Sequence, residues 1–395
     1  MRIRYSTDNK GRPIKKAIVY TSDEHGINRS DVDGEAVRIV NRLKQAGHES
    51  YIVGGAVRDL ILGKKPKDFD IVTSASPSQI KRIFRNARII GRRFRLVHVY
   101  AGDSIYEVAT FRSIKEGPTG NTFGTIEEDV LRRDFTMNAL FYEPSEQIVV
   151  DYVGGFKDIK ARRIRPIIPL SVIFKDDPVR MIRAVKYAAT TGFKIPFLVG
   201  WKIRKDAFLL NGISPSRRTE ELFKIINSGY AKAISENLHS FTLFRYLQPE
   251  AVRLMHENPQ FHVRYFQSLS ELDGLLKSGT EPRSGEVLSF IIRDYLNTIV
   301  NWDTEPVEAY RAAFAACRTY ILPMNPPRIE LENAVRLLFR EHGIGIKKAR
   351  TFEKGRNKEA VPETRTEEVQ LELDQGIKKR RRHRRKKPSD KREPL

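Results

Sequence analysis

Residues 51–73, which read YIVGGAVRDLILGKKPKDFDIVT, constrain the fold more than any other stretch of the chain. An apolar run ends at Gly54 and Gly55, a helical pattern follows, and a second apolar run begins after the basic loop KKPK. Glycines let backbone amides approach a phosphate closely, and the N-terminus of the following helix favours an anion. Arg58, on the first turn of that helix, can add a guanidinium contact. The stretch therefore predicts a strand, a phosphate-binding turn, a helix and a second strand.

Two aspartates, Asp68 and Asp70, flank Phe69 in the second expected strand, DFDIVT. Residues i and i+2 of a strand project from the same face, so both carboxylates can bind one or two divalent cations while Phe69 points into the core. A phosphate-binding turn beside a metal site indicates phosphoryl-group chemistry. Taken alone, an Asp-x-Asp pair is also common on solvent-facing strands and in sugar-nucleotide enzymes, and GG-x-x-R is equally unspecific. The combination at this spacing is the specific signal.

The composition indicates a globular chain with a polyanionic partner. Its 395 residues are 40% hydrophobic and 30% charged, and 71 Lys and Arg against 49 Asp and Glu leave a formal net charge of +22. Nine of the ten residues from Lys378 to Lys387 are basic. Such a run predicts a disordered tail that lies along phosphates, or else a solvated and nonspecifically sticky end.

Cysteine usage and the N-terminus bear on the cellular compartment. Cys317 is the single cysteine, and the 8 histidines show no Cys/His spacing of a zinc site, so we expect neither an intrachain disulfide nor a structural metal. The opening MRIRYSTDNKGRPIKK lacks the apolar core of a signal peptide, and no run reaches the roughly 18 apolar residues of a membrane span. We therefore expect a cytoplasmic protein without a membrane partner.

Apolar periodicity predicts an α+β chain. Short β-rich runs such as SYIVG, LVHVYA, IYEVATFR, ALFYE and IVVDYVG alternate with helical pieces, and amphipathic helices such as RIELENAVRLLFREHG dominate afterwards. We expect a charged arm over 1–30, a head with a small mixed sheet and helices over 31–165, a helical neck over 166–232, a helical body over 233–345 and a disordered basic tail over 346–395.

The stretch 51–73 closely resembles the head-domain motif of the class II template-independent nucleotidyltransferases, the family of bacterial poly(A) polymerases and CCA-adding enzymes. The resemblance implies a third acidic metal ligand, Glu107 in IYEVATFR, which could otherwise be an exposed strand glutamate. RRDFTMNA matches the family motif that holds ribose and triphosphate, which implies nucleotide binding by Arg133 and Asn138 and catalysis by Asp134. Without the family, Arg-Arg-Asp is only a local ion-pair cluster.

DDPVRMIRAVKYAATTG places Asp177, Arg180 and Arg183 on one side of an expected helix. An aspartate accepts and an arginine donates hydrogen bonds, so together they can pair with the edge of a nucleobase. The family uses its EDxxR motif in this way as a protein template, and this chain has Asp176 in place of the usual glutamate. The alternative is a capped helix with a salt-bridged outer face.

Three features bear on the branch of the family. GRRFR within 89–100 is similar to the poly(A) polymerases, Ser216 replaces a glutamate common in CCA-adding enzymes, and the basic C-terminal run also resembles poly(A) polymerases. Against this, EGPTGNTFGTIEED is short where the poly(A) branch can carry an insertion, and GRRFR could be only a polar hairpin. The residues expected to bind RNA are Arg92, Arg93, Arg95, Lys378, Lys379, Arg380, Arg381 and Arg382.

The resemblance implies a monomeric poly(A) polymerase that adds AMP from ATP to RNA 3′ ends and supports RNA turnover. Asp68, Asp70 and Glu107 would hold two Mg²⁺ ions, with Mn²⁺ as a substitute, while the glycine turn, Arg58 and Arg133 position the triphosphate. A CCA-adding tRNA nucleotidyltransferase is the alternative within the family. A non-catalytic basic RNA-binding protein is the alternative from another class.

Overall fold

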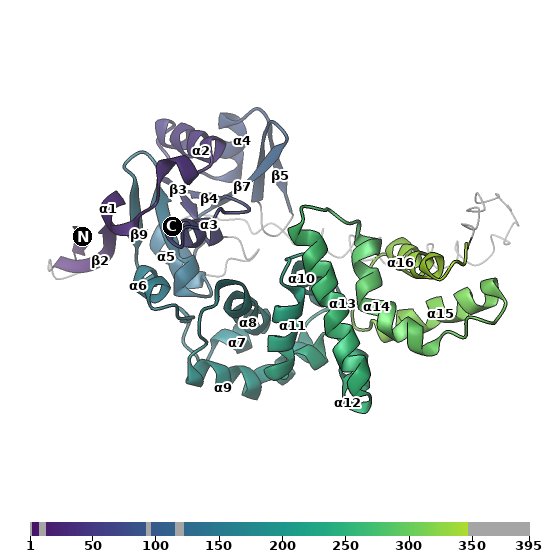
Figure 1. Ribbon diagram of the computed structural model, residues 1–395. Coiled ribbons are helices and arrows are strands. Elements are labelled where there is room, and N and C mark those ends of the chain that lie inside the picture. Colours follow the sequence, from purple (N-terminus) through teal and green to yellow (C-terminus); the bar gives the residue numbers. More distant parts are fainter. Residues whose placement is uncertain (1, 8–12, 92–95, 115–121, 347–395) are drawn as a thin grey trace, which may run out of the picture. The chain divides into compact units, whose positions relative to one another are not determined.

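The computed structural model describes residues 2–7, 13–91, 96–114 and 122–346 (Figure 1). These residues form a mixed sheet with its helices, followed by a long series of helices. The α+β fold class predicted from the sequence is confirmed. Among the described residues no helix has the length and apolar character needed to cross a membrane.

The strands of the described residues form one nine-stranded sheet with the order β1-β2-β9-β8-β3-β4-β7-β6-β5. Each neighbouring pair is antiparallel except β4 and β7, which run parallel. The strands are β1 (Arg2–Thr7), β2 (Pro13–Tyr20), β3 (Ser50–Val53), β4 (Asp70–Thr73), β5 (Ala87–Ile90), β6 (Leu96–Ala101), β7 (Ser104–Thr110), β8 (Leu140–Glu143) and β9 (Ile148–Asp151).

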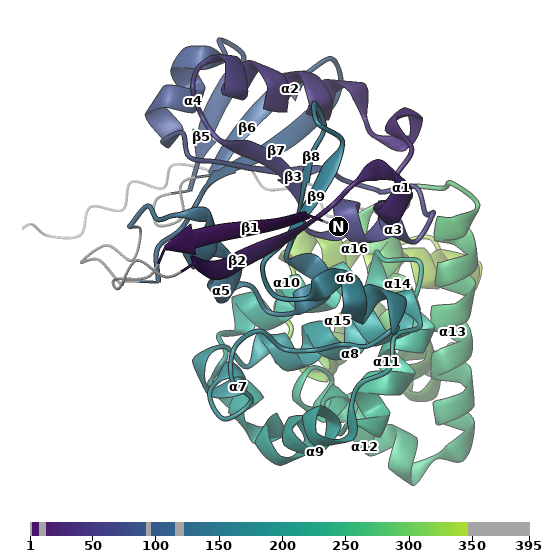
Figure 2. The ribbon, with the colours of Figure 1, turned by 90° about the vertical axis from the view of Figure 1, so that its left-hand side faces the viewer.

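Alternating side chains give the sheet two apolar faces. Ile71 packs with Val40 and Ile80 under the helices α2 (Gly34–Gln45) and α4 (Pro77–Ile83), which Figure 2 shows on one side of the sheet. Val72, the next residue, packs on the opposite face with Val130 of α5 (Ile126–Arg132). A period of two along β4 therefore separates the two cores.

The helices begin and end at residues with the expected capping chemistry. Asp33 accepts a hydrogen bond from the Ala36 amide at the start of α2, and Gly192 closes α8 (Val179–Thr191) with a φ of 73°. The other helices in or beside the sheet are α1 (Ser22–His25), η1 (Arg29–Asp31), α3 (Gly55–Ile61), η2 (Thr136–Asn138) and α6 (Gly155–Lys160).

The helical part begins at α7 and contains the amphipathic segments expected from the sequence. Its hydrophobic core is continuous with the core on the α2 side of the sheet, and the single cysteine, Cys317, is buried within it. Its elements are α7 (Ile173–Asp176), α8, α9 (Phe197–Asp206), η3 (Ala207–Gly212), α10 (Pro215–Ile226), α11 (Ala231–Ser240), η4 (Phe244–Tyr246), α12 (Pro249–Glu257), α13 (Pro259–Lys277), α14 (Ser284–Ile299), α15 (Pro306–Tyr320) and α16 (Arg328–Glu341).

The N-terminal segment differs from the charged arm that we expected over residues 1–30. Strand β2 pairs with β9, and its residues 17–20 are buried in the sheet. The sequence does not reveal this strand, because its apolar run AIVY has only four residues and is too short to show a period. The basic residues before that run favour an exposed segment instead. The prediction of an arm is therefore wrong for residues 13–20.

Candidate functional site

The glycine turn predicted from the sequence connects β3 to α3. Gly54 has a φ of 75° and a ψ of −136°, a conformation that L side chains rarely adopt. A side chain added there would also lie against Asp70, because an ideal Cβ would be 3.4 Å from its Oδ2 atom. Glycine at this position therefore lets the backbone turn directly above the Asp70 carboxylate.

Asp70 begins β4 and lies beside Glu107 of β7. The two strands are parallel and in register, so both side chains project from the same face of the sheet. Burial and the charges of Glu107 and Asp68 raise the pKa of Asp70 to about 6. The charge of Arg133 opposes that shift. Although protein atoms surround it densely, the Asp70 side chain still reaches solvent at the wall of an open cavity.

Glu107 lies on the neighbouring strand β7, as the prediction required, whereas Asp68 lies outside β4. Asp68 lies two residues before the first residue of β4, so the prediction that both aspartates lie on one strand is wrong. Glu107 is exposed, and its Oε1 atom is 3.7 Å from Nε2 of His98. No three His, Cys, Asp or Glu side chains within the described ranges already form a metal-binding group. Mg²⁺ does not need one, because it binds through one or two carboxylates together with substrate phosphates and water.

Arg133 and Arg58 are held in place by hydrogen bonds on either side of Asn138. The Nε and Nη2 atoms of Arg133 donate to Oδ2 of Asp129 at 3.1 and 2.9 Å. Nη1 of Arg58 donates to Oδ1 of Asn138 at 2.7 Å, and its Nε donates to Asp59 at 2.9 Å. Both guanidinium groups therefore have defined orientations before any ligand binds.

Asp134 joins the head to α8. Nε of Arg180 donates to its Oδ1 at 3.0 Å, and Nε of Arg183 lies 2.9 Å from its Oδ2 in an ion pair without hydrogen-bond geometry. Arg180 also donates to Asp176. The two arginines thus face the same way, as their spacing predicted. Asp134 binds these arginines in the structure, which makes it a residue that orients α8.

The aspartate expected to read the base is also paired. Asp177 accepts a hydrogen bond from Nη2 of Arg217 at 2.7 Å and another from the Val179 amide at 3.1 Å. It ends α7 and lies outside α8, so it acts as a local cap as well. A nucleobase that pairs with Asp177 and Arg180 would have to share or replace these partners.

Tyr187 is a site residue that the sequence motifs did not indicate. Its hydroxyl accepts a hydrogen bond from Nη2 of Arg183 at 3.2 Å, and its ring centroid is 5.5 Å from Cζ of Arg58. The ring also meets Phe135 edge to face at 6.0 Å. Its position four residues after Arg183 on α8 is the signal that could have found it, because i and i+4 residues share a helix face.

These residues surround a cavity of about 250 Å³, which we call the head cavity. It combines the glycine turn, the end of α5 and the exposed side of α8, three segments far apart in the sequence. Asp68, Glu107, Arg58, Asp177 and Arg180 are not in its lining. Of these, Arg58 contacts the lining residue Asn138, and Arg180 contacts the lining residue Asp134. The lining residues are Gly54, Gly55, Asp70, Arg132, Arg133, Asp134, Asn138, Arg183 and Tyr187.

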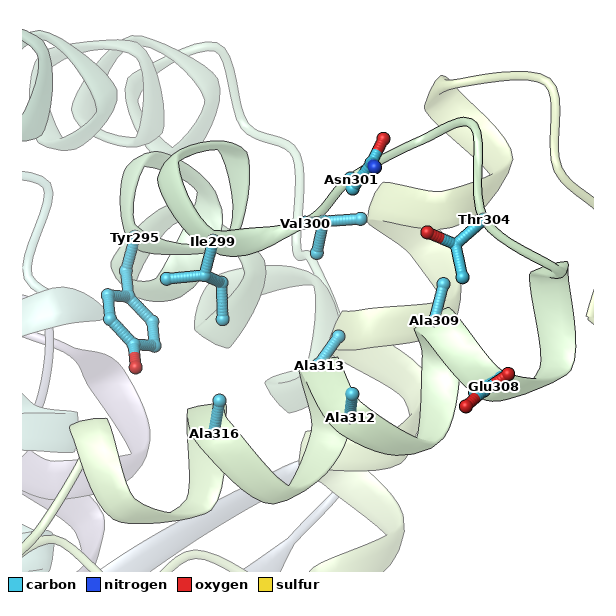
Figure 3. A pocket seen from close by; sticks show the side chains of 10 residues that line it. All are labelled: Tyr295, Ile299, Val300, Asn301, Thr304, Glu308, Ala309, Ala312, Ala313 and Ala316. Carbon is cyan, nitrogen blue, oxygen red and sulfur yellow. The ribbon is translucent and has the colours of Figure 1, made fainter.

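A second cavity, of about 380 Å³, lies between α14 and α15 (Figure 3). Its lining is mainly alanine and other apolar side chains, with Glu308 as the one charged residue and no cation. A phosphate-bearing ligand has no cationic partner in this lining, whereas the head cavity offers three arginines. The predicted RNA-binding residues Arg92, Arg93, Arg95, Lys378, Lys379, Arg380, Arg381 and Arg382 lie outside the described residues.

Two family models match the chain. The model described as the poly A polymerase head domain matches residues 50–165, and that described as the probable RNA and SrmB-binding site of polymerase A matches residues 192–255. The first match contains the glycine turn, Asp70 and the RRDFT segment. It therefore covers every lining residue of the head cavity except Arg183 and Tyr187 of α8, which neither model covers.

Curated relatives include poly(A) polymerases I and CCA-adding enzymes. The poly(A) polymerase I of Escherichia coli O6:H1 is 44% identical over 259 residues, which are 62% of this chain and 56% of that protein. That of Haemophilus influenzae is 40% identical over 58% of this chain and 55% of its own length. The CCA-adding enzyme of Bacillus pumilus is 33% identical over 60% of this chain and 61% of its own length. The chain thus spans a little over half of the length of the curated relatives it matches.

Solved structures of CCA-adding enzymes share the fold. The Bacillus stearothermophilus CCA-adding enzyme in complex with CTP is 28% identical, with a TM-score of 0.51 over 78% of this chain and 82% of that one. The Thermotoga maritima CCA-adding enzyme complexed with tRNA is 19% identical, with a TM-score of 0.50 over 82% of this chain and 85% of that one. At this identity the likeness supports the fold alone. The chain therefore contains a segment that matches the poly A polymerase head domain and resembles the template-independent nucleotidyltransferases, with higher identity to these poly(A) polymerases I than to these CCA-adding enzymes.

Proposed function

We propose that the protein is a polynucleotide adenylyltransferase, a poly(A) polymerase that transfers AMP from ATP to RNA 3′ ends and releases pyrophosphate. The observation that carries this proposal is the head cavity, where a carboxylate below a glycine turn faces three arginines and an asparagine. A cavity with this lining complements a nucleoside triphosphate, since arginines bind phosphates and Asn138 can bind a sugar hydroxyl. The 44% identity to a poly(A) polymerase I supports the choice of reaction.

Asp70, with Asp68 and Glu107 beside it, would hold divalent cations, Mg²⁺ or in its place Mn²⁺. The charges of Asp68 and Glu107 both raise the pKa of Asp70, and a cation bound between these carboxylates relieves that repulsion. Two such ions, when bound, would lower the pKa of the RNA 3′-hydroxyl and neutralise phosphate charge. The chain's own contribution is to orient the triphosphate through Gly54 and Arg133.

Adenine selection would belong to Asp177 and Arg180. The carboxylate accepts and the guanidinium donates, so the pair matches a base edge that has both a donor and an acceptor. Arg217 and Asp134 hold the two side chains in the structure, which fixes where that edge is presented. Asp134 acts in this proposal as a positioning residue that links the ribose end of the site to α8.

RNA and ATP would be the partners of a monomer in the cytoplasm, where the enzyme supports RNA turnover. The family model over 192–255, whose description names RNA, supports a binding role for the segment after α8. We retain a head over 31–165, a neck over 166–232 and a body over 233–345 as the functional division. The basic tail over 346–395, which lies outside the described residues, would add affinity through phosphate contacts.

Incubation of the full chain with labelled RNA and each nucleoside triphosphate separately tests the proposal. We expect extension with ATP alone, on RNAs of varied sequence and to varied lengths. Incorporation of CTP, with addition ending after three nucleotides on tRNA, would instead assign the chain to CCA addition, the activity of several relatives. RNA binding without any incorporation would make it a non-catalytic RNA-binding protein.

A further inference from the structure

Helix α9 and the following η3 expose large apolar side chains to solvent. We call this surface the aromatic face, and it consists of Phe197 (84% exposed), Leu198 (66%), Trp201 (51%) and Phe208 (58%). Monomeric proteins rarely expose several large apolar side chains side by side unless the surface binds something.

The aromatic face lies opposite the side of α9 that packs into the core. At 100° per residue, positions 197, 198 and 201 of α9 fall within one arc, and the buried Val199 and Ile203 fall on the other side. Phe208 is exposed on η3, the 3-10 helix that follows α9. A surface helix needs only one apolar side for folding, so the second side is not explained by the core.

Positive charge accompanies these rings. Nζ of Lys205 lies 4.8 Å from the ring centroid of Trp201, and Cζ of Arg204 lies 4.4 Å from that of Phe241. The single acidic residue of α9 and η3, Asp206, is buried and pairs with Lys202 at 2.8 Å. The exposed side therefore combines aromatic rings with cations and carries no carboxylate of its own.

A pocket of about 700 Å³, with polar and apolar side chains in its lining, begins at the end of η3. Asn211 of η3 belongs to its lining, together with Arg245, His239 and His256 from the helices beyond. Arg218 donates to the carbonyl oxygens of Asn211 and Tyr246, which ties η3 to the other wall of the pocket. Donors that can bind phosphates thus continue where the rings end.

We propose that the aromatic face is a stacking platform for a single-stranded part of the RNA substrate. Bases stack on Trp201, Phe197 and Phe208, while Lys205 and the pocket around Arg245 bind the phosphates. Rings with interleaved cations suit single strands of any sequence, because every base has a π-face. This inference rests on the proposed function, and the cations together with the absence of acidic residues from the exposed side favour a polyanion such as RNA over a basic protein partner.

The test replaces the rings with leucine, which is also apolar but cannot stack on a base. In the full chain, the triple variant F197L/W201L/F208L should bind a fluorescent oligoadenylate about tenfold more weakly, or weaker still, in fluorescence anisotropy. The slope of affinity against salt should not change, because the phosphate contacts remain. The KM for the RNA primer should rise while the KM for ATP does not.

Three controls separate stacking from other effects. Trp201→Phe should retain most of the affinity that Trp201→Leu loses, and these single exchanges on an exposed side leave the fold least disturbed. An abasic oligonucleotide of the same length should bind wild type and the leucine variants alike. Val263→Ala, at a residue 63% exposed on α13, should leave RNA affinity unchanged.

Two outcomes would overturn the platform. One is equal oligoadenylate affinity of the leucine triple variant and wild type. The other is a wild-type dimer in sedimentation that Trp201→Glu dissociates, which would make the face a contact between two copies.

AMP transfer measured on the same wild-type preparation distinguishes a failure of the platform from a failure of the proposed function. Ring-dependent RNA affinity without AMP transfer overturns only the proposed function, and AMP transfer with ring-independent affinity overturns only the platform.

Discussion

The head cavity and the aromatic face hold their side chains in opposite ways. In the head cavity the arginines are paired before any ligand arrives, as with Arg133 on Asp129 and Arg183 on Asp134. On the aromatic face the rings of Phe197 and Trp201 are exposed, and Lys205 lies over the ring of Trp201. Charges fixed in this way suit a reaction that requires one geometry, whereas exposed rings suit the proposed binding of RNA of varied sequence, because any base can stack on them.

The largest effect should come from the carboxylate below the glycine turn. Asp70→Asn keeps the shape of the side chain and removes its charge, so AMP transfer should fall by about a hundredfold to a thousandfold. RNA affinity should stay within about twofold of wild type, because the aromatic face is untouched. Primer extension and anisotropy measure the two quantities. Asp303→Asn, at an exposed aspartate after α14, is the matched control. Full activity in the Asp70 variant would contradict the assignment of this site.

The second prediction concerns the stability that the paired charges give to the head. Asp134→Asn removes the charge shared by Arg180 and Arg183, and we expect the free energy of unfolding to fall by about 3 kcal/mol because one buried partner is lost. Glu257→Gln breaks the exposed pair with Arg253 on α12 and should change that free energy far less, because solvent screens the pair. Urea denaturation of both variants gives the comparison. Equal effects would mean that burial does not distinguish the two pairs.

The smallest effect should come from Tyr187, whose side chain contacts both Arg58 of α3 and Arg183 of α8. Tyr187→Leu removes the ring near Arg58 and the hydroxyl bonded to Arg183, and should raise the KM for ATP about tenfold. Tyr187→Phe keeps the ring and should raise it only about threefold, which corresponds to one hydrogen bond. Steady-state kinetics at saturating RNA check both values. A change in kcat with no change in KM would argue against a role in holding the nucleotide.

Sequence reasoning found the parts of the site that depend on local pattern. The glycine turn, the strands of the head and the spacing of Arg180 and Arg183 follow from periods of two and 3.6 residues, which the sequence displays directly. The fold class was confirmed for the same reason. Whether the predicted roles of these residues hold is a matter for the experiments above.

Other features depend on partners that no local pattern reveals. The pairing of Asp177 with Arg217 and of Asp134 with two residues of α8 arises from tertiary packing. Strand β2 was missed because only its pairing with β9 identifies it as part of the sheet. The aromatic face was also missed, since a helix that is apolar on two sides reads from sequence as a fully buried one.

The parallel pairing of β4 and β7 has a consequence for how the head folds. A parallel pair needs a crossover, and here the intervening chain supplies α4, β5 and β6 before β7 returns to the side of β4. Asp70 and Glu107 therefore become neighbours only after that long loop closes, which is slow because its entropy is lost before the contacts form. We expect catalytic competence to appear among the last steps of refolding, so that recovered AMP transfer reports a completed head rather than a collapsed one.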